Sequence, residues 1–290
     1  MKTMRVLLLL VLAVVMARSA AGEEPDAELI AKITGLKPDV KNGIAKVSVP
    51  RGDLAAVIDG AKMQPFQGLT TWAAFQAAGG KTIVMGDMTL TEPQVNPTMS
   101  AALDNGLQVT ALHNHFFFDR PHVFFMHIDG LGTTEQLATG VRKALDAANA
   151  AQRGTGFGGV SIPPKSTIDS KPLETILGAS AQAKDGIAKF SFGQKTSMHG
   201  TEVGEGMGVN TWAAFAGSQR AAVVDGDFAM LEDELQDVLK ALRHANINIV
   251  AIHNHMTHEQ PRIMFLHFWG KGPAEELARG VKSALDAQKK

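Results

Sequence analysis

The chain has 290 residues, a formal net charge of −1 and no cysteine, and 45% of its residues are hydrophobic. The lack of cysteine excludes disulfides and thiolate metal ligands, and the near-neutral charge gives no reason to expect a nucleic-acid partner. The length suits two domains of ordinary size.

The N-terminal segment 1–22 has the pattern of a secretory signal peptide. Lys2 and Arg5 form a positive start, Val6 to Ala17 is an almost unbroken apolar run, and small residues follow at 19–21. This run is shorter than the ~20 residues that usually span a bilayer, so a retained anchor is the weaker alternative. We therefore expect cleavage, no membrane span afterwards, and a periplasmic or secreted protein.

The rest of the chain contains one unit twice. Thr71–Phe75 returns as Thr211–Phe215, and Gly140–Ala147 returns in similar form as Gly280–Ala287, both at the same offset along the chain. Two long units are too few for a solenoid, so tandem duplicated domains are the simpler interpretation. A Gly- and Pro-rich stretch between the copies indicates a linker. The predicted division is a signal peptide at 1–22, a first repeat at 23–152, a linker at 153–164 and a second repeat at 165–290.

Each unit alternates strand and helix patterns in the same order. In the first unit, strands are expected over 44–49, 70–76, 82–90, 107–115 and 123–129, with helices from Thr91 to Asn105 and over 133–148. Thr91 and Gln94 can form a capping box, and Ala78-Gly79-Gly80 signals a hairpin turn. The order β-β-α-β-β-α, with a further strand before it, predicts an α+β fold with helices on one face of a mixed sheet.

Several longer motifs resemble a known family. They are Trp72–Phe75, Met85–Asp87, Glu92–Pro97, Val109–His115 and Phe125–His127. Together they are similar to the LppY/LpqO family of bacterial exported proteins, which is built on a domain of unknown function. The resemblance covers both units and implies an exported location. It implies no activity, and the chain lacks the cysteine that lipoprotein members acylate.

Histidines are concentrated in two windows of the chain. Eight of the ten lie within residues 113–127 and 253–267. Because alternate residues of a strand share a face, His113 and His115 should point the same way. If His115 lies opposite Phe125 in the next strand, His127 lies opposite His113, and three imidazoles converge. Three nitrogen ligands and a carboxylate or water suit Zn²⁺ or another divalent transition metal. The predicted metal ligands are His113, His115 and His127 in the first unit and His253, His255 and His267 in the second.

Four carboxylates are candidates for catalytic roles. Asp119 and Glu259, in the loops between the histidine strands, could complete the metal site or take a proton from a bound water. Asp87 and Asp227 each follow a glycine inside a strand. That strand should be parallel to the His113 strand and is a candidate neighbour of it, so a carboxylate there could orient a ligand or act as general base. The alternative is that these acids only fix turns.

Two classes of function remain open from the sequence. In one, the protein binds metal, or is a metal-dependent hydrolase, and acts on an unknown small molecule. In the other, it is a non-catalytic envelope scaffold or binding protein in which the histidines are structural. Neither a nucleophile elbow nor a phosphate-binding glycine loop is present, so no nucleotide cofactor is expected.

Overall fold

The structure is a computed structural model that describes residues 24–151 and 161–288. The expected signal peptide at 1–22 and most of the predicted linker, residues 153–160, lie outside the described residues. None of the helices within the described ranges is long and apolar enough to cross a membrane.

The first unit contains three α-helices and nine strands within its described part. The helices are α1 (Ala27–Thr34), α2 (Glu92–Asp104) and α3 (Thr134–Ala150). The strands are β1 (Asp39–Lys41), β2 (Ile44–Pro50), β3 (Val57–Ile58), β4 (Ala61–Lys62), β5 (Thr70–Ala78), β6 (Lys81–Thr91), β7 (Gln108–Asn114), β8 (Asp119–Arg120) and β9 (Val123–Gly132).

The second unit repeats this arrangement with small changes. Its helices are α4 (Ser170–Leu177), α5 (Leu235–His244) and α6 (Ala274–Ala287). Its strands are β10 (Gln182–Lys184), β11 (Ile187–Gly193), β12 (Thr196–Met198), β13 (Thr201–Val203), β14 (Asn210–Gly217), β15 (Ala222–Leu231), β16 (Asn248–His253) and β17 (Ile263–Gly272). The predicted β-β-α-β-β-α order is thus contained in a longer one.

Twelve of these strands form one sheet that runs through both units. Its order is β1-β2-β5-β6-β9-β7-β16-β17-β15-β14-β11-β10. Every pairing between described strands is antiparallel, so the α+β class is confirmed while the expectation of a mixed sheet is wrong. The reason is that β9 and β17 insert between strands that would otherwise be parallel neighbours.

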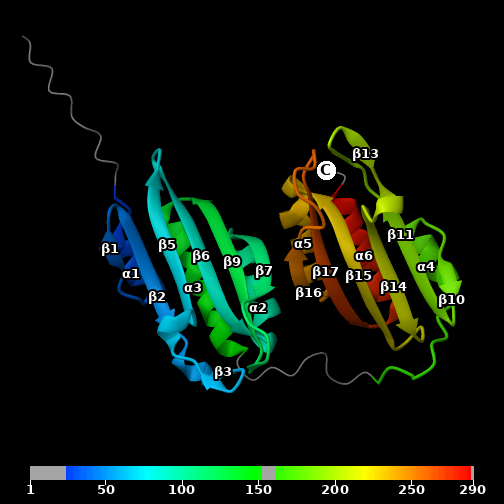
Figure 1. Cartoon of the computed structure of the whole chain (residues 1–290), viewed down its shortest axis with the longest axis horizontal. Coiled ribbons are helices and arrows are strands. Elements are labelled where there is room, and N and C mark those ends of the chain that lie inside the picture. Colours follow the sequence, from blue (N-terminus) through cyan, green and yellow to red (C-terminus); the bar gives the residue numbers. More distant parts are fainter. Residues whose placement is uncertain (1–23, 152–160, 289–290) are drawn as a thin grey trace, which may run out of the picture.

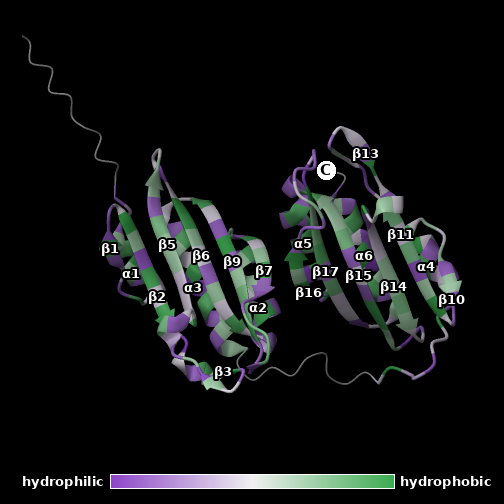
Figure 2. Ribbon diagram, in the orientation of Figure 1, coloured by the Kyte–Doolittle hydropathy of each residue, from purple (hydrophilic) through white to green (hydrophobic). Residues whose placement is uncertain are grey.

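The helices cover only one face of the sheet (Figure 1). Along β6, Val84, Met88 and Leu90 are buried toward the helices, while Met85 on the other face is 60% exposed. Polar and apolar residues alternate in this way along several strands (Figure 2). The sheet therefore keeps one face in contact with a core and leaves the other largely bare.

At one end of the bare face, each unit adds a small cap. In the first unit β3, β4 and β8 form a three-stranded sheet, and Leu54, Leu69 and Phe125 belong to a small core of their own. The second unit uses the hairpin β12–β13, near a core that contains Val209 and Phe265. No pattern in the sequence predicted these caps.

The two units join edge to edge through a local twofold relation. Leu112 of β7 pairs with Ile252 of β16, its counterpart in the second copy of the repeat. The Asn96 side chain donates to the Ile249 carbonyl at 3.0 Å and accepts from its N–H at 2.8 Å. The Gln236 side chain, which occupies the position of Asn96 in the second copy, makes the same two bonds to Val109 at 2.9 and 3.0 Å. Each unit thus binds the backbone of the other in the same way.

Candidate metal centre

The three histidines of each unit lie on the helix-free face of the sheet, beside the cap. In the first unit His113 is on β7, His127 is on β9 and His115 directly follows β7. The His113 ring centroid is 5.1 Å from the centroids of both His115 and His127. The His113 ring therefore lies beside both of the other imidazoles, and their binding of one common ion stays a prediction.

The pairing that brings the rings together differs from the predicted one. His113 lies opposite Phe125, and His127 lies opposite Ala111, so the predicted register is wrong by two positions. His115 has left the ladder and stacks on Phe125 at a centroid distance of 3.4 Å. The parity of the strands is unchanged by a shift of two, and the three rings therefore still share a face.

Asp87 and Asp227 belong to the clusters. The strand β6 is parallel to β7, as expected, but it is not its neighbour, because β9 lies between them. Asp87 is consequently the direct cross-strand partner of His127, and Asp227 is that of His267. The glycine before each acid is required by close packing. At Gly226 an added Cβ would lie 2.2 Å from the Trp212 carbonyl and 2.4 Å from the Phe268 ring.

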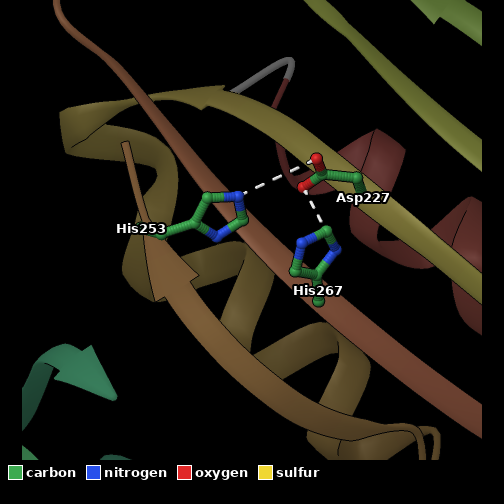
Figure 3. Close-up of side chains that lie close together, drawn as sticks. All are labelled: Asp227, His253 and His267. Atoms are coloured by element: carbon green, nitrogen blue, oxygen red, sulfur yellow. Dashed lines mark ion pairs between the residues drawn. The ribbon is translucent and has the colours of Figure 1, made fainter. Parts of the chain in front are cut away.

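In the second unit the donor atoms lie at distances suited to one ion. One donor atom each from Asp227, His253 and His267 lies within 4.8 Å of the other two. Figure 3 shows both imidazoles turned toward the carboxylate, with His253 Nε2 and His267 Nδ1 each 3.9 Å from an oxygen of Asp227. Tetrahedral ligands placed 2.0–2.1 Å from zinc are about 3.3 Å apart.

His255 lies against the same group. Its Nε2 is 3.1 Å from Asp227 Oδ2 and 3.1 Å from His253 Nε2. His255 therefore lies beside the group formed by Asp227, His253 and His267, and a group of imidazoles and a carboxylate suits zinc and related divalent ions.

Burial sets the protonation of this cluster. It raises the pKa of Asp227, against the opposing effect of His267 and His255. It lowers the pKa of His253 to about 4, and the neighbouring imidazoles His267 and His255 act in the same direction. His253 is therefore a neutral imidazole near pH 7, the form that binds a metal. The Asp227 Oδ1 and His253 Nδ1 atoms are buried without a hydrogen-bond partner among the described residues.

In the first unit the same residue types are arranged as a stack. The planes of His113 and His115 are 15° apart, whereas those of His253 and His255 are 43° apart. Burial raises the pKa of Asp87 and lowers that of His115. The planes of the other pair are similar in the two units, at 26° for His113 and His127 and 21° for His253 and His267. What distinguishes the second unit is that, among the described residues, only there do three such donor atoms lie within 4.8 Å of one another.

Asp119 and Glu259 form hydrogen bonds within the loops beside the clusters. Asp119 Oδ2 accepts the Val123 N–H at 2.7 Å, and Oδ1 lies 3.0 Å from His122 Nδ1. Glu259 Oε1 accepts the Ile263 N–H at 3.2 Å. Both acids are buried, and these contacts tie the loop to the start of the following strand. The structure thus brings Asp87 and Asp227 to the imidazoles, and it engages Asp119 and Glu259 with loop atoms.

The sequence analysis did not identify the phenylalanine ring that stacks against a histidine in each cluster. His255 stacks on Phe265 at 3.6 Å and 13°, as His115 does on Phe125. The signal was present, because a phenylalanine stands two positions before His127 and His267 in both copies and so shares their face. This ring fixes the orientation of the second histidine of each His-Asn-His motif.

The fold and the clusters together define a class: a tandem α+β protein with histidines and an aspartate clustered in each unit, of which the second brings Asp227, His253 and His267 together. A match between the sequence and a family model shows the family. The chain belongs to the family described as Domain of Unknown Function (DUF1259), whose model matches residues 28–147 and 171–287. Two tandem copies of this domain agree with the internal repeat.

Comparisons with individual proteins add little to this. No curated protein matches the chain. A solved structure, described as the crystal structure of a trimeric bacterial microcompartment shell protein PduB, aligns over 86% of this chain and 89% of its own length. The identity is 11% and the TM-score is 0.21, which is too low to carry an argument about fold or function.

Proposed function

We propose that the second unit binds a divalent transition metal ion, with zinc the first candidate, through Asp227, His253 and His267. The observation that carries this proposal is the approach of their donor atoms to within 4.8 Å of one another. A mixed set of imidazole and carboxylate, in a chain without thiols, suits zinc, copper, nickel or iron. In this proposal Asp227 is a ligand and not only a general base.

The exposure of the site favours a role that involves an external ligand. The side chains of His267 and His255 are 48% and 35% exposed. Structural zinc sites are closed by four protein ligands, and catalytic sites keep one position for water or substrate. If His255 is not a ligand, it stands beside that open position as a candidate proton acceptor. A bound zinc ion would lower the pKa of a water molecule there, which is the basis of metal-assisted hydrolysis.

The first unit is proposed as a second, weaker site. It carries Asp87, His113, His115 and His127 at the corresponding positions. The buried Asp87 Oδ1 has no hydrogen-bond partner among the described residues, as in the second unit. A metal ion would supply that partner once the donor atoms of the histidines had moved closer together.

Export is part of the same proposal. The apolar N-terminal segment supports a cleaved signal peptide, and the motifs quoted above support membership of the LppY/LpqO group. A periplasmic or secreted location would expose both sites to metals outside the cytoplasm.

Metal analysis of the purified protein tests the proposal. We expect stoichiometric zinc after dialysis against a zinc buffer, and its loss when His113, His127, His253 and His267 are all replaced by alanine. The control is His244→Ala, which removes an exposed histidine that pairs with Asp104 outside both clusters. Metal-free wild-type protein with the same thermal stability in zinc and in chelator would contradict metal binding and support a scaffold with structural histidines.

A further inference from the structure

The first unit contains a cavity on the side of the sheet that faces the helices, away from the histidines. Its volume is about 220 Å³, and its lining includes Val49, Met88 and Leu145 together with Arg51, Arg142 and Asn149. An apolar cavity of about 150 Å³ is sufficient for a molecule the size of benzene. The space is therefore large enough for a small organic ligand.

Two arginines, Arg51 and Arg142, line this cavity together with the Asp53 carboxylate. The Arg51 side chain is only 8% exposed and pairs with Asp53, which is 43% exposed, at 2.9 Å. Arg142 pairs with the half-exposed Asp146. Most of the guanidinium N–H groups already have acceptors. Arg51 donates to Asp53, Gln94 and the Thr89 carbonyl. Arg142 donates to Asp146 and the Thr34 carbonyl. Since a guanidinium has five N–H groups, one of Arg51 and two of Arg142 remain for a ligand anion.

The cavity also continues into an apolar space. The cavity borders a narrow crevice of about 10 Å³ that shares Val49 and Met88 with it and is also lined by Val47 and Val141. We propose that this cavity binds a small carboxylate with a short hydrocarbon chain. The carboxylate is held by Arg51 and Arg142, and the chain lies over Val49, Met88 and Leu145.

The second unit shows what the same place looks like without such a ligand. Phe192 and Phe228 occupy the positions of Val49 and Met88, and larger side chains take up more space there. Gln194 replaces Arg51, and Lys282 replaces Arg142.

Arg51 is not needed to satisfy the backbone group that it contacts. Its Nη1 donates to the Thr89 carbonyl in the first unit. In the second unit, Gln288 Nε2 donates to the corresponding Ala229 carbonyl at 2.9 Å. An uncharged amide is sufficient for this bond, so the bond alone does not require an arginine at position 51.

Isothermal titration of the full chain with octanoate tests the proposal. We expect one octanoate per chain, and binding at least about tenfold weaker in the double variant Val49→Phe, Met88→Phe, which copies the second unit. Arg142→Leu should weaken octanoate by a similar factor and octanol much less. The matched control Lys282→Leu, which removes one ion pair with Asp286 in the second unit, should leave octanoate binding unchanged.

Two outcomes would overturn the proposal. One is that the wild-type protein gives no heat of binding with octanoate. The other is that the filled cavity variant, or Arg142→Leu if the filled variant does not fold, binds octanoate as tightly as the wild type. Zinc content should be the same in all these variants, because the cavity and the histidine clusters lie on opposite faces of the sheet.

Discussion

The two units carry the same four potential ligands at corresponding positions, yet the side chains are arranged differently. In the second unit the rings of His253 and His255 are inclined by 43° and their Nε2 atoms approach to 3.1 Å. In the first unit His113 and His115 are nearly parallel. The difference shows that the strand register fixes which residues meet, and that the surroundings decide how their rings are turned.

The surroundings differ most at the loop over each site. In the first unit this loop contains Phe117 and Phe118, which are 85% and 78% exposed. In the second, His258 takes the place of Phe118, and Arg262 takes that of His122. Arg262 lies 3.5 Å from Glu232, so it is engaged at the rim and is not directed at the cluster. One site thus has an apolar rim and the other a polar one.

The largest effect that separates the units should be on metal affinity. We expect zinc to bind in two steps, with the second unit at least about tenfold tighter because its donors already lie close together. His253→Ala with His267→Ala should remove the tighter step, with a loss of at least about 100-fold, since even outer groups contribute roughly 10–100-fold. His113→Ala with His127→Ala should remove only the weaker step. Competition titration against a chromogenic chelator measures both, and a single step of equal affinity in all variants would refute the distinction.

The next effect is on packing beside the acids. Gly226→Ala should destabilise the protein by about 3 kcal/mol, because a Cβ there overlaps both backbone and the Phe268 ring. Gly86→Ala should cost about 1 kcal/mol, since its contacts are 2.8 Å to the Trp72 carbonyl and 2.9 Å to the flexible Ile128 side chain. Thermal unfolding in chelator compares the two. Equal losses would show that the glycines are not distinguished by these contacts.

A smaller effect should appear in the dependence of stability on pH without metal. The His253 pKa is lowered to about 4 in the folded protein from 6.5, so the unfolded chain binds more protons between these values. Stability should therefore fall as the pH drops from 6.5 to 4, by about 2 kcal/mol after allowance for partial exposure.

The variant His253→Gln isolates this contribution. Asp227 titrates in the opposite sense, because its raised pKa favours the folded state at low pH, and this contribution remains in the variant. We expect His253→Gln to flatten the decline in melting temperature between pH 6.5 and 4. His244→Gln is the control outside the clusters, and a decline equal to that of the wild type in His253→Gln would contradict the assignment.

The smallest expected effect is the loss of stability when a lysine beside a tryptophan ring is replaced, and it should be equal in the two units. Lys46 lies 4.3 Å from the Trp72 ring centroid, and Lys189 lies 4.3 Å from that of Trp212. Each Lys→Ala replacement should cost about 0.5–1 kcal/mol. Chemical denaturation of the two variants should give equal losses. A clear difference between the two losses would show that neighbouring groups also contribute to the free energy of unfolding. One such group is Asp225, whose pKa is raised by burial, with Lys189 acting in the opposite direction.

Much of this arrangement could be predicted from the sequence because strand geometry is local. The alternation of side chains placed His113 and His127 on one face, and the capping box at Thr91 and Gln94 placed the start of α2. These inferences need only neighbours in the chain. They hold even though the register was misjudged by two positions.

What could not be predicted depends on contacts far apart in the sequence. The insertion of β9 between β6 and β7 placed Asp87 opposite His127, and no local pattern specifies the order of strands in a sheet. The register between β7 and β9 depends on the number of residues in the loop that joins them. Part of that loop forms β8 and pairs with β3 in the cap, which no local pattern indicates. Short, exposed strands such as β3 and β4 carry too few residues for a clear periodic pattern.

The reciprocal bonds of Asn96 and Gln236 describe an isologous contact, in which both partners use the same surface. A polypeptide with a single unit could form this contact only by meeting a second molecule, so the pairing would weaken on dilution. Joining the partners in one chain makes the encounter intramolecular and independent of protein concentration. Each cluster and each rim is then free to change separately, as no symmetry obliges the two halves to remain alike.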